Sequence, residues 1–128
     1  MQTLITNDIK ISVENFYRPE HSAPSLFKFV FSYEINIHNM GDRTVQLLRR
    51  HWYIMDALGL LREVEGPGII GKQPILKPGN IHQYESGCEL TTNIGKMYGY
   101  YLMEDLNTGE HLKILIPEFQ MIAAFKNN

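Results

Sequence analysis

Apolar and polar residues alternate over the segment between residues 26 and 38. Every second position there carries an aromatic or β-branched side chain, namely Phe27, Phe29, Phe31, Tyr33, Ile35 and Ile37. A period of two places these side chains on one face of a sheet, whereas a helix would spread them around its circumference. The segment is therefore predicted to be a long strand with one buried face.

Other segments have the same alternation, or a composition that favours a pleated surface. They span residues 9–14, 44–56, 60–65, 81–86, 96–104 and 112–119, and Pro117 is expected to end the alternation in the last of them. Turn residues separate the segments, and Pro78-Gly79 suits the centre of a type II turn. About seven strands without a long amphipathic helix predict an all-β fold, an antiparallel β-sandwich.

Chain length and composition narrow the possible classes of protein. With 128 residues, 44% of them apolar, the chain is expected to form a single folded domain, 1–128. Residues 18–24 are predicted to form a polar loop, and Lys126-Asn127-Asn128 is expected to fray. The formal net charge is −2, without the basic excess that phosphate contacts require, so nucleic acid is not an expected partner.

The cellular location is predicted from the cysteine content and the N-terminus. Cys88 is the one cysteine, which excludes an internal disulfide and suits a reducing compartment. The first residues have no basic region followed by an apolar core, and no apolar run reaches the roughly 20 residues of a membrane-spanning helix. We expect a cytoplasmic protein without a membrane partner.

A glycine motif lies at Gly66-Pro67-Gly68-Ile69-Ile70-Gly71 and fits the pattern G-x-G-x-x-G. In dinucleotide-binding folds such a motif opens a helix, but Pro74 follows too soon for a helix here. The interpretation we favour is a glycine-rich bulge or crossover, where the backbone must bend or approach another strand closely. A nest of backbone N–H groups that binds an anion remains an alternative, with Gly66, Gly68 and Gly71 as its candidate residues.

Sequence signatures of catalysis or metal binding do not occur. The histidines are not spaced as a metal pair, and no G-x-S-x-G elbow, P-loop or H-E-x-x-H motif is present. Cys88 is expected to be a packed small residue. The sequence therefore predicts neither an enzyme nor a cofactor.

The segment Arg49-Arg50-His51-Trp52 has the composition of an interface hot spot. One interpretation is a cationic and aromatic surface for a partner, with Arg49, Arg50 and Lys72 as candidate contacts. The other places Trp52 in the core and pairs Arg50 with a carboxylate such as Glu63 or Glu65. We favour the second interpretation for Trp52, because a lone tryptophan in a sandwich usually packs in the core.

Several linked segments together resemble the ApaG family over roughly residues 9 to 121. They read FSYEINIHN at residues 31–39, VQLLRRHWYI at 45–54, EVEGPGIIGKQP at 63–74, Pro78-Gly79, YESG at 84–87 and IPEF at 116–119. The resemblance implies a fibronectin type III-like or immunoglobulin-like β-sandwich and a small bacterial protein without established enzyme activity. The family is linked genetically to cobalt and magnesium resistance or efflux.

The family resemblance also bears on binding. Related domains occur in an F-box ubiquitin-ligase subunit and in a protein that partners a DNA polymerase, where protein recognition is the supposed role. Our first hypothesis is therefore a non-enzymatic module that binds an unidentified protein, and self-association is left open. The alternative is a sensor of pyrophosphate or a nucleotide, because the family's glycine motif maps onto Gly66, Gly68 and Gly71. Pro67 stands where the family would have an acidic or polar residue.

Overall fold

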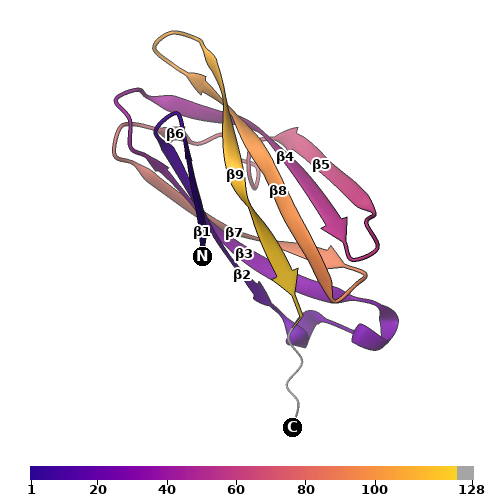
Figure 1. Cartoon of the computed structure of the whole chain (residues 1–128). Helices are drawn as coiled ribbons and strands as arrows, with labels where there is room; N and C mark the ends of the chain where they lie inside the picture. The colour runs from indigo at the N-terminus through magenta and orange to yellow at the C-terminus, as the bar shows by residue number, and fades with distance from the viewer. Residues whose placement is uncertain (124–128) are drawn as a thin grey trace.

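The computed structural model describes residues 1–123, which form two antiparallel sheets packed face to face (Figure 1). The first sheet has the strand order β1 (Gln2–Thr6), β2 (Ile9–Tyr17), β3 (Phe29–Asn39) and β7 (Ile81–Leu90). The second has the order β5 (Leu61–Pro67), β4 (Val45–Asp56), β8 (Ile94–Asp105) and β9 (His111–Ile122), and β6 (Ile75–Leu76) also pairs with β4. The predicted β-sandwich is confirmed.

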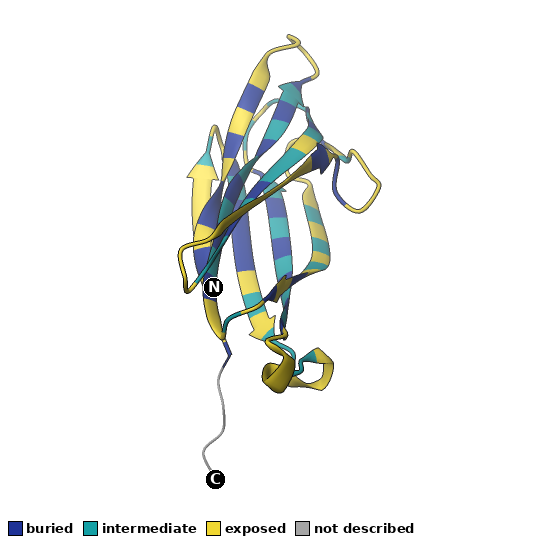
Figure 2. Cartoon of the chain, turned by 90° about the vertical axis from the view of Figure 1, so that its right-hand side faces the viewer, coloured by how far each residue is buried: buried dark blue, intermediate teal, exposed yellow. Residues whose placement is uncertain are grey.

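The alternation in β3 determines which face of this strand is buried between the sheets. Its odd-numbered residues from Phe29 to Ile37 are buried between the sheets, and the even-numbered ones face outward, which gives the striped strands of Figure 2. The prediction for Phe27 was wrong. Phe27 follows the short 3-10 turn η2 (Pro24–Leu26), has a φ of 55° and is 72% exposed, so it precedes the strand.

Strand limits differ from the predicted ones at both ends of the chain. The sequence pattern missed β1, which pairs with β2 through a two-residue turn at Asn7 and Asp8, both with positive φ. It also missed the short strand β6. Pro117 does not end β9. The pairing of β8 with β9 is irregular between Met97 and Gly99, and a proline is tolerated at such a bulge on an edge strand.

Turns and loops follow the expected chemistry more closely. At Pro78-Gly79 the amide of Asn80 donates to the carbonyl of Lys77 at 2.9 Å, and Gly79 has a φ of 87°, as a type II turn requires. The polar loop at residues 18–24 holds the short 3-10 turn η1 (Pro19–His21) and the start of η2. The residues Lys126-Asn127-Asn128, expected to fray, lie outside the described residues.

The two sides of the sandwich differ. On one side β1 and β2 approach β9, where Asn15 donates to the carbonyl of Gln120 at 3.0 Å and the amide of Leu115 donates to Thr6 Oγ1 at 3.3 Å. On the other side the edge strands β5 and β7 flank a cleft that opens between the sheets. This open side carries the glycine motif and Arg50.

Candidate functional site

The glycine motif forms a tight hairpin at the rim of the cleft. The amides of Ile69 and Lys72 each donate to the other residue's carbonyl, at 2.8 and 2.9 Å. The two residues between them, Ile70 and Gly71, both have positive φ, 47° and 71°. Positive φ at both central positions is the geometry of a type I′ turn. The chain then runs into β6, so this glycine motif turns a hairpin and opens no helix.

The glycine at position 68 is required by this geometry. It has a φ of 63°, and a Cβ atom there would lie 2.2 Å from the carbonyl oxygen of Lys72. Its amide donates to the carbonyl of Leu48 at 2.8 Å. Because the amides of Gly68, Ile69 and Lys72 are all used within the protein, a backbone nest for an anion would rest on Ile70 and Gly71.

A bulge in β4 decides where the two arginines lie. The register between β4 and β8 shifts between Leu47 and Arg49, so one extra residue, Leu48, interrupts the alternation. Before the bulge the odd-numbered residues of β4 face the core, and after it the even-numbered ones do. Arg50 and Trp52 therefore point between the sheets, whereas Arg49 lies on the outer face of the second sheet.

Arg49 forms the ion pair with Glu65 that was expected of Arg50 from the sequence. Its Nη2 and Nε atoms lie 2.6 and 2.9 Å from Oε1 of Glu65. The hydrogen bond and charge of Arg49 lower the pKa of the Glu65 carboxyl. Arg50 instead donates from Nη1 to the carbonyl oxygens of Pro67 and Gly68, at 3.0 and 3.1 Å. The expected pairing of Arg50 with Glu63 or Glu65 was wrong, while the expected burial of Trp52 is confirmed.

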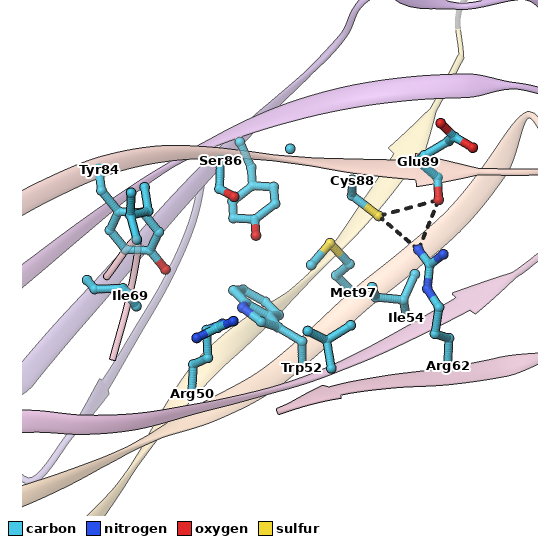
Figure 3. A pocket seen from close by; sticks show the side chains of 14 residues that line it. Arg50, Trp52, Ile54, Arg62, Ile69, Tyr84, Ser86, Cys88, Glu89 and Met97 are labelled. Atoms are coloured by element: carbon cyan, nitrogen blue, oxygen red, sulfur yellow. Dashed lines mark hydrogen bonds between the residues drawn. The ribbon is translucent and has the colours of Figure 1, made fainter. Parts of the chain in front are cut away.

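The cleft between the sheets has a volume of about 350 Å³ (Figure 3). Its floor is apolar and includes Trp52 and Met97, both buried. One wall carries Arg50 and Arg62 from β4 and β5, and the other carries side chains of β3 and β7, among them Tyr33, Tyr84, Ser86 and Cys88.

Burial shifts one thiol and three tyrosine hydroxyls in or next to the cleft toward their neutral forms. Burial raises the pKa of the Cys88 thiol, which is 8% exposed, so Cys88 is a packed residue and a poor nucleophile. The hydroxyls of Tyr84 and Tyr101 hydrogen-bond to each other across the sandwich, and burial raises the pKa of both. Tyr33, which lines the cleft, also has its pKa raised by burial.

Arg62 spans the mouth of the cleft. Its Nη2 atom donates to the carbonyl oxygen of Glu89 on β7 at 2.9 Å and lies 3.7 Å from Cys88 Sγ (Figure 3). Arg62 belongs to β5, so this contact joins the two edge strands on the open side. No signal in the sequence distinguished Arg62 from the other charged residues of its strand.

A row of stacked rings covers the outer face of the second sheet. Tyr98 stacks on Tyr53 with centroids 5.1 Å apart, Tyr53 on His51 at 4.7 Å, and His51 on Tyr100 at 5.1 Å. Lys113 Nζ lies 4.2 Å from the centre of the Tyr100 ring. We call the four rings the aromatic row. The sequence showed these residues in two strands, but their meeting depends on the register of β4 and β8.

Hydrogen-bond contacts of His51 and a shallow hollow border the aromatic row. His51 Nε2 lies 3.3 Å from Glu63 Oε2, and His51 Nδ1 lies 3.3 Å from the hydroxyl of Tyr100. A hollow of about 330 Å³ is lined in part by Arg49, Tyr100 and Lys113. This outer face therefore combines aromatic rings with cationic side chains.

The three cationic candidates from the sequence do not form one patch. Arg49 lies beside the aromatic row and Arg50 lies in the cleft, on opposite faces of the second sheet. Lys72 is exposed on the glycine hairpin, where its charge acts with burial to lower the pKa of His82. Burial is the larger cause of that shift.

Two kinds of feature are absent from residues 1–123, a metal site and a membrane-spanning helix. Within that range no three His, Cys, Asp or Glu side chains come together as a metal site. Within the same range no helix has the length and apolar character needed to cross a bilayer.

Comparison with known proteins gives one consistent family. A model of the ApaG domain matches residues 19–105. The chain is 47% identical to Protein ApaG of Paramagnetospirillum magneticum over 94% of its own length and 92% of the relative's. It is 46% identical to Protein ApaG of Acidithiobacillus ferrooxidans, covering 91% of each.

A solved structure has the same fold. The crystal structure of the putative ApaA protein from Bordetella pertussis superposes with a TM-score of 0.87 at 41% identity, over 90% of this chain and 93% of that one. The family match covers all the residues that line the cleft and all four rings of the aromatic row, and it ends where β8 ends. On sequence and on structure, the chain belongs to the ApaG family.

Proposed function

We propose that the protein is a non-enzymatic interaction module that binds another protein through the outer face of its second sheet. The observation that carries this proposal is the aromatic row, flanked by Arg49 and Lys113. Tyrosine and arginine dominate the binding energy of protein interfaces, because they offer large contact areas with polar ends.

The aromatic row is held in place before any partner arrives. Cross-strand stacking positions Tyr98 on Tyr53 and Tyr100 on His51, and a hydrogen bond fixes His51 to Glu63. Side chains ordered in advance lose little conformational entropy on binding. A surface built on central strands is also more rigid than one built on loops.

The outer face of the first sheet serves as an internal comparison. Its central strands β2 and β3 present polar and charged side chains there, including Lys10, Glu14, Glu34 and His38. Such residues are depleted at interface cores. The proposal therefore assigns the partner to the second sheet and leaves the first one exposed to solvent.

In this proposal the protein acts in the cytoplasm. It would affect cobalt and magnesium resistance, to which the family is linked genetically, through the partner protein that it binds. The alternative function, an anion sensor at Gly66, Gly68 and Gly71, is supported by the positive φ values of Ile70 and Gly71 at the hairpin tip. Thermal-shift titration with pyrophosphate tests the sensor, since a ligand of the native state must raise the melting temperature.

A pull-down from the native cell lysate tests the interaction surface. The baits are the unchanged protein, the double variant Tyr53→Ser/Tyr100→Ser in the aromatic row, and the double variant Lys10→Ser/His38→Ser on the opposite outer face. Circular dichroism checks that each bait is folded. We expect the unchanged and Lys10/His38 baits to retain the same protein, and the Tyr53/Tyr100 bait to bind it at least about tenfold more weakly.

Two results would contradict the proposal. One is that the unchanged bait retains nothing above background. The other is that the aromatic-row variant retains the partner as well as the control does.

A further inference from the structure

The arginines of this protein fall into two groups. Arg18, Arg43 and Arg49 each form an ion pair with a carboxylate. Arg50 and Arg62, the two that line the cleft, donate to backbone carbonyl oxygens, and within residues 1–123 neither has a carboxylate within ion-pair distance. Within the described residues, both cleft arginines therefore lack an anionic partner.

The acidic residue of the lining does not neutralise them. Glu89 contributes its backbone carbonyl to Arg62, while its carboxylate lies 4.0 Å from Lys28 Nζ. A guanidinium held beside apolar surface has lost part of its hydration, and an anion that binds there restores the lost interactions. The cleft thus favours a ligand with a negative charge.

The wall opposite the arginines is compatible with such a ligand. It presents the hydroxyl groups of Tyr84 and Ser86, which carry no negative charge at neutral pH. The floor, formed in part by Trp52 and Met97, offers apolar surface (Figure 3). An anion bound in this cleft would therefore have to carry an apolar body as well as a charged end.

The volume of the cleft limits the size of the ligand. A space of about 350 Å³ holds roughly twelve non-hydrogen atoms, at about 30 Å³ for each water-sized group. We propose that the cleft binds a small organic carboxylate, with the carboxylate at the Arg50 guanidinium and the apolar body against Trp52 and Met97. Arg62 stands at the entrance and adds a second cation.

This site is separate from the outer face assigned to a protein partner, and the inference does not rest on that assignment. It also differs from an anion site on the glycine hairpin. Pyrophosphate and acetate have no apolar body, so they should bind poorly in the cleft. Binding of a carboxylate in the cleft and binding of a protein partner at the outer face can therefore be tested independently, and either can be disproved without the other.

Direct titration of the full chain with defined probes tests the proposal. The charged probes are octanoate and indole-3-acetate, and octanamide and indole-3-acetamide are their neutral counterparts. Acetate and pyrophosphate are the anions without an apolar body. We expect the two carboxylates to bind and to raise the melting temperature, and both amides to bind at least about tenfold more weakly, since a charged hydrogen-bond partner is lost.

Neighbouring variants locate the site. Arg50→Met should weaken carboxylate binding by at least about tenfold, whereas Arg49→Met, which changes the adjacent residue on the other face, should leave it unchanged. Val64→Trp is a second variant. Val64 lines the cleft and is partly exposed, so a tryptophan ring at this position would fill the cleft. Carboxylate binding should be lost in Val64→Trp even though Arg50 is intact.

The proposal is overturned if neither carboxylate binds at millimolar concentration, or if the amides bind as tightly as the acids. Equal binding by the Arg49→Met and Arg50→Met variants would also overturn it. If Arg50→Met does not fold, the test rests on Val64→Trp. Carboxylate binding that is retained in Val64→Trp would show that the cleft is not the binding site.

Discussion

Arg49 and Arg50 are adjacent in the chain but lie on opposite faces of the second sheet. Arg49 forms an ion pair with Glu65 on the outer face, while Arg50 reaches between the sheets to the carbonyls of Pro67 and Gly68. In a regular strand adjacent residues always point to opposite faces, but which one faces inward depends on the register. Here the bulge at Leu48 shifts the register, so that Arg50 and not Arg49 faces inward.

Replacing each arginine with alanine should separate their roles in stability. Arg50→Ala removes two hydrogen bonds to backbone carbonyls at the rim of the cleft, so we expect the free energy of unfolding to fall by about 1–3 kcal/mol. Arg49→Ala removes an exposed ion pair, which contributes little to stability, so it should leave the free energy nearly unchanged. Urea denaturation measures both, and equal losses would contradict the assignment.

The β3 core gives a prediction with a control in the same segment. Phe31 is fully buried, and Phe31→Ala should lower the free energy of unfolding by about 3–5 kcal/mol, because it leaves a cavity. Phe27 is exposed before the strand, so Phe27→Ala should change it by less than about 0.5 kcal/mol. A large loss at position 27 would show that the strand begins earlier than the structure has it.

The comparison of these two phenylalanines shows what the sequence could predict. Alternation identified β3 because its buried side chains alternate with outward ones that are mostly polar, and that signal is local. It failed at Phe27, where the chain turns after Pro24. It could not orient Arg49 and Arg50 either, since two adjacent leucines, Leu47 and Leu48, hide the position of the bulge.

The binding surfaces were harder to predict than the strands. The cleft and the aromatic row depend on which strands pair and in what register, and neither follows from local periodicity. His51 meets Tyr100 because the two residues are register partners of β4 and β8. Arg62 meets Glu89 because β5 and β7 end different sheets on the same side. The glycine motif was visible in the sequence, but the hairpin that it forms, with Gly68 against the Lys72 carbonyl, was not specified by the motif.

Two glycines of the motif should respond differently to alanine. Gly71 has a φ of 71° and open space where a Cβ would lie, so Gly71→Ala should cost about 1–2 kcal/mol from backbone strain alone. Gly68→Ala has similar strain and also places a Cβ against the Lys72 carbonyl, so its cost should be clearly larger. Thermal or urea unfolding of both variants tests this, and equal costs would contradict the close approach.

Alkaline pH should destabilise the protein through its buried tyrosines. Burial raises the pKa of Tyr101, and of its partner Tyr84, above the ordinary value of about 10. Above that pH the unfolded chain releases these protons while the folded state retains them. The contribution of these tyrosines to the free energy of unfolding is therefore fully present below about pH 10, and it is lost as the pH rises toward their pKa in the folded state. Tyr101→Phe should flatten this decline in pH-dependent unfolding, and an unchanged slope would contradict the prediction.

The footprint of the captured partner on the ¹⁵N-labelled protein tests the proposed function most directly. Amide chemical shifts of β4 and β8 around His51 and Tyr100 should change most when the unlabelled partner is added, with little change around Lys10 and His38. If the largest changes fall on the outer face of β2 and β3, or only on the hairpin at residues 66–74, the second sheet is not the contact surface.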